Sequence, residues 1–403
     1  MSTHSKNVPC AMNNSETTTH TYIDTLQGLQ GFHAQNKEVS WLGFDTEFVG
    51  ERTYYPLLCL IQVATEHGNY LIDPIAIKDL SLFLDLITDP KIVKLTHAGE
   101  NDYRLLYQEF GVLPVNVYDT QMAAGFIGYN YPVSFASLLQ GELRVTLDKG
   151  PAVSDWESRP ISKKQLQYAL NDVIYLEQLW NGINLKLAEK DRENWVTEEF
   201  NKLQNAKSYQ SDPNKEFLAN SILPKINVRD KLFLMRLYKW RIEMAEKKNK
   251  PKERILQKKL INHITTGIKG GKRNLQNNRL IPPHIIDKDG STFLALYDQP
   301  ESPEEREILN QIAKHVPIKP RIDAVMDILY LGIKIICSQN KIAPELVIDR
   351  PRYKTMKWDL NYFDESLDTG WRKELLGENV LHSIRNRNQL KVDTKSEFFG
   401  LKM

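Results

Sequence analysis

The feature that most constrains the fold is a regular alternation, over the first two hundred residues, between short apolar runs and helical patterns. Strands are predicted where β-branched and other apolar residues cluster between turn residues, namely in 39–48, 57–65, 69–73, 91–97 and 115–120. Helical spacing of apolar residues appears between these runs, in 77–88 and 100–111. An alternation of this kind predicts an α/β sheet flanked by helices.

A long helix is predicted to begin near Ser162. Ser162 and Gln165 fit a capping box, with serine at the N-cap and glutamine at N3. One apolar face then runs through Leu166, Ala169, Val173, Leu176 and Trp180. From about residue 222 onward the pattern is helical, and basic loops separate the helices. The chain therefore divides into an α/β part followed by all-helical parts.

Charge is distributed unevenly along the 403-residue chain, although its net value is only +2. Residues 1–221 carry 18 Lys and Arg against 28 Asp and Glu, residues 222–299 carry 18 against 7, and residues 300–403 carry 17 against 16. An acidic part is suited to holding cations, and a strongly basic part is suited to holding a polyanion. The alternative is that the segregation of charge is incidental.

Several classes of protein are excluded by composition. No apolar run approaches the roughly 20 residues needed to span a bilayer. Residues 1–20 are polar and lack the apolar segment of a secretory signal, so we expect a disordered lead-in. Cys10, Cys59 and Cys337 are far apart in the sequence, which favours a reducing cytoplasm over a disulfide scaffold or a structural zinc site.

Two carboxylates interrupt the first apolar run, within residues 43–48 (GFDTEF). Asp45 and Glu47 are two residues apart, and residues i and i+2 of a strand point to the same face. Like charges at that spacing repel, and burying either carboxylate without a partner is costly. The segment therefore needs neutralising partners from elsewhere.

Two further acids complete a candidate constellation. Asp102 lies in the first turn of a predicted helix, and Asp172 lies in the long predicted helix. Four carboxylates can share one site if cations neutralise them, and hard oxygen ligands select Mg²⁺ or Mn²⁺ rather than zinc. Two such ions suit phosphodiester hydrolysis, because one activates the attacking water and the other stabilises the leaving 3′ oxygen. Asp45 is the candidate to bridge both ions.

A tyrosine belongs to the same constellation. Tyr168 precedes Asp172 by four residues, so the two side chains share a helix face. Its hydroxyl can hydrogen-bond the attacking water and help to orient or deprotonate it. Each element alone has a simpler explanation, such as a surface acid pair, a partner of a helix dipole, or a half-buried tyrosine beside a solvated acid. Their conjunction, in this order and on these elements, favours the metal-dependent interpretation.

These residues resemble the three motifs of ribonuclease D, an exonuclease family whose motifs supply Asp-Glu, Asp and Tyr-x-x-x-Asp. The first motif corresponds to FDTEF followed by ERTYYPLLCLIQV, the second to HAGENDYRLL, and the third to SDWESRPISKKQLQYALNDVIYL. The resemblance runs from about residue 22 to residue 180. It is specific because it also includes the flanking segments RTYYP, DTQMAA and LDK.

The resemblance implies a ribonuclease H-like sheet and a two-metal 3′–5′ exonuclease of the tyrosine subtype. Four acids match the implied metal ligands, in the order Asp45, Glu47, Asp102 and Asp172. Tyr168 is implied to be a further catalytic residue, and the implied cofactors are two divalent ions, Mg²⁺ or Mn²⁺. The implied reaction releases nucleoside 5′-monophosphates from RNA 3′ ends. The implied substrates are structured precursors, chiefly tRNA 3′ trailers.

The rest of the chain is similar to the family's helicase-and-ribonuclease-D C-terminal (HRDC) modules. Residues 232–264 look like a first module, and residues 370–384 look like the end of a second. The fold class implied is an α/β exonuclease domain, with a mixed sheet flanked by helices, followed by one or two all-α modules. The predicted divisions are a lead-in (1–20), an exonuclease domain (21–210), an HRDC helical domain (222–300), a second helical HRDC-like domain (301–390) and a polar tail (391–403).

RNA is the partner that we expect, bound by a monomer in the cytoplasm without membrane involvement. The residues leave two alternatives open. The same chemistry acting on DNA would make a 3′–5′ DNA exonuclease of repair. An inactive nuclease domain would make a nucleic-acid-binding scaffold, although all four ligand positions are filled.

Further residues are candidates for contacts with a nucleic acid. Phe48 and Tyr54 are candidates to stack on bases, although core packing is the favoured explanation for Phe48. His97 is expected to cap a strand end, and Asp119 is expected to begin a helix rather than to bind a metal. Candidate phosphate contacts in the basic part are Lys247, Lys248, Lys250, Lys252, Lys269, Lys272 and Arg273.

Overall fold

The computed structural model describes residues 19–147, 155–210, 212–312, 320–359, 362–393 and 400–402. The predicted lead-in, apart from Thr19 and His20, lies outside the described residues, as does part of the predicted polar tail. Among the helices of the described ranges, none combines the length and the hydropathy that a membrane span requires.

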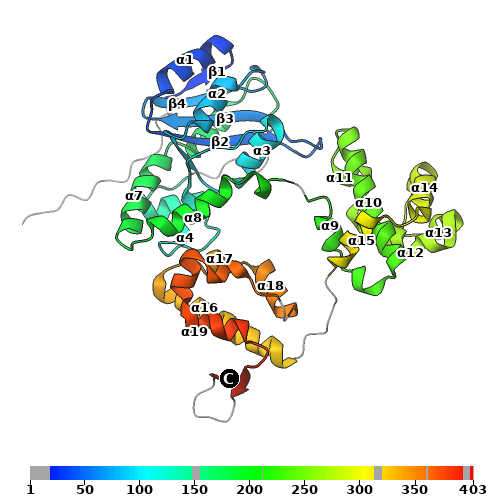
Figure 1. Ribbon diagram of the computed structural model, residues 1–403. Helices are drawn as coiled ribbons and strands as arrows, with labels where there is room; N and C mark the ends of the chain where they lie inside the picture. Colours follow the sequence, from blue (N-terminus) through cyan, green and yellow to red (C-terminus); the bar gives the residue numbers. More distant parts are fainter. Residues whose placement is uncertain are drawn as a thin grey trace, which may run out of the picture.

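A mixed six-stranded sheet forms the centre of the N-terminal part (Figure 1), in the order β1-β4-β3-β2-β5-β6. Its strands are β1 Thr21–Ile23, β2 Trp41–Val49, β3 Leu57–Thr65, β4 Gly68–Ile72, β5 Val93–Thr96 and β6 Val117–Asp119. β3 is antiparallel to β2 and β4, whereas β5 is parallel to β2 and β6. The predicted mixed sheet is confirmed, and β1, which pairs in parallel with β4, was not predicted.

Helices cover both faces of this sheet. They are α1 Leu26–Asn36, α2 Ser81–Thr88, α3 Glu100–Phe110, α4 Thr120–Gly125, α5 Phe135–Glu142, α6 Lys163–Asn171, α7 Leu176–Ala188 and α8 Glu193–Leu203. On one face, Phe44 of β2 packs against Phe83 of α2 and Tyr103 of α3. On the other face, Leu60 of β3 clusters with Leu170 of α6. Strands buried on both sides read as near-continuous apolar runs, as β3 does here.

The long helix predicted from Ser162 is two helices. The capping box is present, because Gln165 N donates to Ser162 Oγ while Ser162 N donates to Gln165 Oε1. However, α6 ends at Asn171 and α7 begins at Leu176. The prediction of one continuous helix was therefore wrong, although its starting point is correct.

The break between α6 and α7 follows from packing against two separate apolar clusters. Leu170 clusters with residues of β3 and β4, whereas Leu176 packs into the main core. Leu176 also lies close over β2, since a Cβ added to Gly43 would stand 3.1 Å from Leu176 Cδ1. A straight helix presents one face, so the chain turns between the two clusters and leaves Asp172 at the C-cap of α6.

The helices after residue 212 form two groups. The first contains α9 Lys215–Leu218, α10 Val228–Lys247, α11 Lys252–Ile255, α12 Lys258–Gly267, α13 Gly271–Asn277, α14 Pro283–Asp298 and α15 Pro303–Asn310. It has its own apolar core, built around residues such as Phe233, Ile264 and Phe293. Phe217 and Ile308 also pack into this core, so the group extends beyond residues 222–300 at both ends.

The second helical group contains α16 Pro320–Asn340, α17 Pro344–Val347, α18 Arg350–Trp358 and α19 Gly370–Arg385. Two short antiparallel strands follow it, β7 Lys391–Asp393 and β8 Gly400–Lys402. Short 3₁₀ turns occur at η1 Ala206–Ser208, η2 Leu223–Lys225, η3 Ile268–Gly270 and η4 Glu365–Asp368.

The two helical groups are attached to the α/β part differently (Figure 1). The second group shares the main apolar core with α4, α7 and α8. There, Arg372 of α19 donates to Glu199 of α8 at 2.6 Å, and the two side chains are only 5% and 8% exposed. The first group has a separate core and meets the loop after β2 through an exposed polar contact. In it, the backbone N–H groups of Tyr54 and Tyr55 donate to Asn249 Oδ1 at 3.0 and 3.4 Å.

Candidate active site

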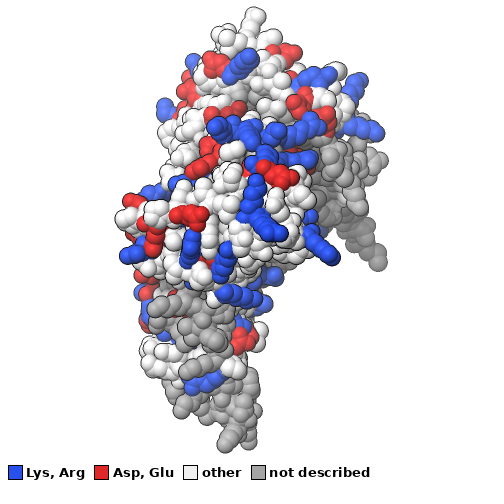
Figure 2. Space-filling view, turned by 90° about the vertical axis from the view of Figure 1, so that its right-hand side faces the viewer, with Lys and Arg blue, Asp and Glu red and all other residues white. Residues whose placement is uncertain are grey.

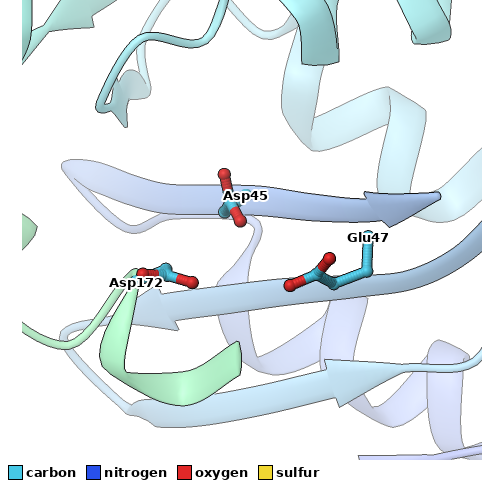
Figure 3. A group of neighbouring side chains, drawn as sticks. All are labelled: Asp45, Glu47 and Asp172. Carbon is cyan, nitrogen blue, oxygen red and sulfur yellow. The ribbon is translucent and has the colours of Figure 1, made fainter. Parts of the chain in front are cut away.

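Three carboxylates from two elements converge on one space (Figure 3). Asp45 and Glu47 project from the same face of β2, and Asp172 reaches them from the C-cap of α6. Each of the three offers an oxygen atom, and these oxygens all lie within 4.8 Å of one another. Because oxygen ligands lie about 2.0–2.6 Å from Mg²⁺ or larger divalent ions, oxygens this close can share one ion.

Asp102 occupies the edge of β2 that β5 leaves free. The pairing of β5 with β2 ends at Gly43, so the later amides of β2 on that side need other partners. Asp102, in the first turn of α3, takes this place: its Oδ1 accepts from Thr46 N at 3.1 Å and from the Thr46 hydroxyl. The fourth predicted acid therefore lies beside the other three, with one oxygen held by the residue between Asp45 and Glu47.

A tight turn between β5 and α3 positions Asp102. Ala98 has a positive φ of 59°, and a Cβ on Gly99 would stand 2.6 Å from Thr96 Oγ1. Gly99 N donates to Asp119 Oδ2 at 2.8 Å, while Asp119 Oδ1 caps α4 by accepting from Met122 N. The expectation that Asp119 begins a helix is confirmed by this capping contact.

His97 lies in the same turn but contacts groups outside the acidic cluster. Its Nδ1 lies 3.0 Å from the Thr120 hydroxyl, and its Nε2 lies 3.1 Å from the Val133 carbonyl. Its ring also packs against Phe135. These contacts give His97 a packing role that links the end of β5 to α4 and the loop before α5.

Burial raises the pKa values of all four acids, and repulsion within the group raises those of Asp45, Glu47 and Asp172 further. Burial, followed by the charges of Asp102 and Asp172, raises the pKa of Asp45 well above its usual value. Burial likewise raises the pKa of Glu47 to about 8 and that of Asp172 to about 7. It raises the pKa of Asp102 to about 6 against the opposing hydrogen bonds from Thr46. Without cations the cluster retains protons near neutral pH, and divalent cations would take their place. The donor set therefore fits hard divalent ions.

Tyr168 lies one helical turn before Asp172 on α6. The charge of Asp172, followed by burial, raises the pKa of Tyr168 to about 12, so the phenol keeps its proton at neutral pH. Its ring lies 6.2 Å from that of the buried Trp156. A protonated hydroxyl can orient a water molecule by hydrogen bonding but cannot remove its proton. Of the two predicted roles for Tyr168, the electrostatics of the site favour orientation.

Two residues of the site were not predicted. Thr46 holds Asp102 through its hydroxyl. The sequence indicates it only as a hydroxyl residue between two acids of a strand, where its side chain points to the face opposite theirs. Gln62 lies opposite Asp45 in the pairing of β2 with β3 and is fully buried. Its signal is a lone amide inside the apolar run LLCLIQVAT.

Comparison with known proteins gives consistent matches. A family model described as a 3′–5′ exonuclease matches residues 20–188. Ribonuclease D of Sphingobium indicum is 29% identical over 375 residues, which cover 91% of this chain and 95% of that protein. Ribonuclease D of Bartonella henselae is 30% identical over 350 residues, which cover 85% of this chain and 84% of that protein. The chain belongs to the ribonuclease D family.

Membership of the ribonuclease D family makes the chain a 3′–5′ exoribonuclease. The crystal structure of Escherichia coli RNase D, described as an exoribonuclease involved in structured RNA processing, has 25% sequence identity and a TM-score of 0.78. The match covers 91% of this chain and 99% of that one, so it includes the C-terminal helices as well as the sheet. The fold class expected from the resemblance is confirmed.

The basic residues predicted to contact phosphates are not equivalent in the structure. Figure 2 shows Lys and Arg side chains gathered on the side of the molecule that includes the first helical group. Lys252 forms an ion pair with Glu216, and Lys269 forms one with Asp230 at 2.7 Å. The remaining candidates are exposed and form no ion pair with the residues that the structure describes; they are Lys247, Lys248, Lys250, Lys272 and Arg273.

The aromatic candidates also differ from expectation. Phe48 is 40% exposed, so the prediction that it packs in the core was wrong. The reason is a shift in the pairing of β2 with β3 between Glu47 and Phe48, which ends the regular alternation of faces. Tyr54 is partly buried and packs edge-on against Tyr55, with ring centroids 4.9 Å apart. Both Phe48 and Tyr54 therefore lie close in sequence to Glu47 with surface left to contact a base.

Proposed function

We propose that this exoribonuclease acts by a two-metal mechanism and releases nucleoside 5′-monophosphates from RNA 3′ ends. The observation that carries the proposal is the group of oxygens from Asp45, Glu47 and Asp172 within 4.8 Å of one another. These acids, together with Asp102, would hold two divalent ions, Mg²⁺ or Mn²⁺. Bound there, the ions would lower the pKa of the attacking water and stabilise the charge on the leaving 3′ oxygen.

The chain's own side chains have separate tasks in this proposal. Asp45 experiences the charges of the other three acids, which makes it the candidate to contact both ions. Thr46 keeps Asp102 in one orientation through its backbone amide and its hydroxyl. Tyr168 remains protonated and orients the attacking water toward the scissile phosphate. Phe48, which is 40% exposed and follows Glu47, would offer an aromatic face to the terminal base.

The proposed substrates are structured RNA precursors, such as tRNAs that carry 3′ trailers. Two observations support this choice: the E. coli relative is described as involved in structured RNA processing, and exposed lysines of the first helical group are available for phosphate contacts. We further propose that the two helical groups are HRDC-type domains beside an exonuclease domain, 21–210, with the boundary expected at residue 300 moved beyond α15, which packs with the first group. The enzyme would act as a monomer in the cytoplasm, where the buried thiols of Cys59 and Cys337 stay reduced.

A degradation assay tests the mechanism. A 5′-labelled tRNA precursor with an extended 3′ end is incubated with the full chain and Mg²⁺, and the products are separated by gel and by mass spectrometry. We expect stepwise shortening with release of nucleoside 5′-monophosphates, and no shortening in EDTA or with Asp45→Asn. Release of no mononucleotide by the wild type, or equal activity of the variant, would contradict the proposal. A matched DNA strand in parallel tests the substrate class, because faster loss of DNA would replace RNA as the proposed substrate.

A further inference from the structure

Gln62 is a buried amide beside the acidic cluster that the proposed mechanism leaves without a task. In the pairing of β2 with β3, Gln62 lies directly opposite Asp45. Residues that face each other in antiparallel strands project to the same side of the sheet, with Cβ atoms about 4.5–5.5 Å apart. The exposed fraction of Gln62 is 0%, so its amide is shielded from solvent.

The amide of Gln62 lacks the hydrogen bonds that a buried amide normally makes. Neither Nε2 nor Oε1 has a partner within the part of the chain that the structure describes. Buried polar groups are paired in the great majority of cases, because an unpaired one is destabilising. Asp45 and Leu71 lie directly opposite Gln62 in the two neighbouring strands, Leu60 and Ala64 flank it along β3, and Glu47 and Asn69 lie diagonally from it. Of the two residues directly opposite Gln62, Asp45 is the polar one.

An apolar side chain at position 62 would fit its apolar neighbours better, so folding alone does not account for the amide. Resting on the proposed function, we propose that Gln62 is a positioning residue: its amide, which has no hydrogen bond to the residues that the structure describes, turns to donate its N–H to the Asp45 carboxylate when divalent ions bind and holds that carboxylate in the orientation that binds them. Thr46 already does this for Asp102. Carboxylates that bind metals are themselves oriented by hydrogen bonds, and losing such a bond typically weakens metal binding about 10–100-fold. A buried water can donate a hydrogen bond to the amide oxygen, Oε1.

The experiment compares Mn²⁺ binding and thermal stability in the full chain with Gln62→Met, which keeps the length of the side chain and removes both polar atoms. We expect the dissociation constant for Mn²⁺, measured by calorimetry or from the free-ion spin resonance signal, to rise about 10–100-fold. The melting temperature in EDTA is expected to stay the same or to rise. Val63→Ala is the matched control, because Val63 is the next residue, is fully buried and faces the other side of the sheet. It should lower the melting temperature and leave the affinity for Mn²⁺ unchanged.

The outcomes separate this inference from the proposed function. An affinity for Mn²⁺ within twofold of wild type in Gln62→Met would overturn the positioning role and leave the metal site standing. Failure of the wild type to bind Mn²⁺, or equal binding by Asp45→Asn, would instead refute the proposed function. If Gln62→Met does not fold, Gln62→Leu takes its place, and failure of both would show that the fold itself needs the amide and would overturn the inference. In an Asp45→Asn background, Gln62→Met should weaken Mn²⁺ binding no further, because its effect passes through Asp45.

Discussion

Removing divalent ions should make the stability of the α/β part fall as pH rises, and the acidic cluster allows the size of that fall to be worked out. Burial, followed by the charges of Asp172 and Asp102, raises the pKa of Glu47 from 4.5 to about 8. The folded state therefore binds this proton more tightly than the unfolded state does. The resulting stabilisation is fully present below the unfolded pKa of 4.5 and is lost as pH rises through about 8.

The magnitude follows from the shift of Glu47 alone. A difference of 3.5 pKa units between 4.5 and about 8 corresponds to at most about 5 kcal/mol, at about 1.36 kcal/mol per unit. Glu47 keeps some contact with water, so screening reduces this ceiling, and we expect a fall of about 2–3 kcal/mol between pH 5 and pH 8. For a domain of this size, that corresponds to a decrease in melting temperature of roughly 4–12 °C. Saturating Mn²⁺ or Mg²⁺ should restore stability at pH 8, by about 2.7 kcal/mol at a hundredfold excess over the dissociation constant.

The assay is differential scanning calorimetry of the full chain at several pH values, with EDTA or with Mn²⁺. Glu47→Gln is the matched control, because it keeps the shape of the side chain and removes its titration. In EDTA the variant should lose less stability than the wild type between pH 5 and pH 8, and the difference between them isolates Glu47 from all other groups. Hydrogen exchange at β2 should show the same pattern locally. A wild-type melting temperature in EDTA that falls no more steeply than that of Glu47→Gln would refute the reasoning.

Three further changes test other parts of the molecule. Tyr168→Phe should lower kcat about 100-fold and leave Mn²⁺ affinity unchanged, because it removes a water-orienting hydroxyl and no ligand; weakened Mn²⁺ binding would contradict this. Glu199→Ala should destabilise the chain by about 3–5 kcal/mol in urea unfolding, because it leaves Arg372 buried without its carboxylate; a loss below about 1 kcal/mol would show the pair to be dispensable. Asn249→Ala removes the acceptor for two backbone amides of the 50–56 loop. It should raise KM for long RNA several-fold and leave KM for a dinucleotide unchanged. Asn249→Asp keeps an acceptor and should behave as wild type.

The part of the site that depends on local geometry could be predicted from the sequence. The placement of Asp45 and Glu47 on one face needs only the two-residue period of a strand. The placement of Asp102 in a first helical turn needs only the helix start after an apolar run, which α3 confirms. Both inferences rest on neighbours within a few positions of the residue concerned, where side-chain direction follows directly from secondary structure.

The part that depends on tertiary packing could not be predicted in the same way. The helical period from Ser162 continues unbroken through Trp180, yet the chain turns after Asn171 because its apolar residues serve two clusters. Phe48 continues the apolar alternation of β2, yet a shift in strand pairing exposes it. In both cases the sequence pattern describes one element in isolation, whereas the outcome is set by a second element that is distant in the sequence.

The same distinction explains why two uncharged residues were overlooked and why they bear on the chemistry. Thr46 and Gln62 flank Asp45, one in the chain and one across the sheet, and neither carries a charge that would mark it as a ligand. A site that crowds four acids must fix each carboxylate against the repulsion of the others when ions are absent, and a cationic side chain there would compete with the ions for the same oxygens. Neutral donors avoid that competition, because they hold a carboxylate oxygen without supplying the charge that the ions must provide. The residues that prepare this site for divalent ions are therefore expected to be polar and neutral, which is the chemistry that the sheet places around Asp45.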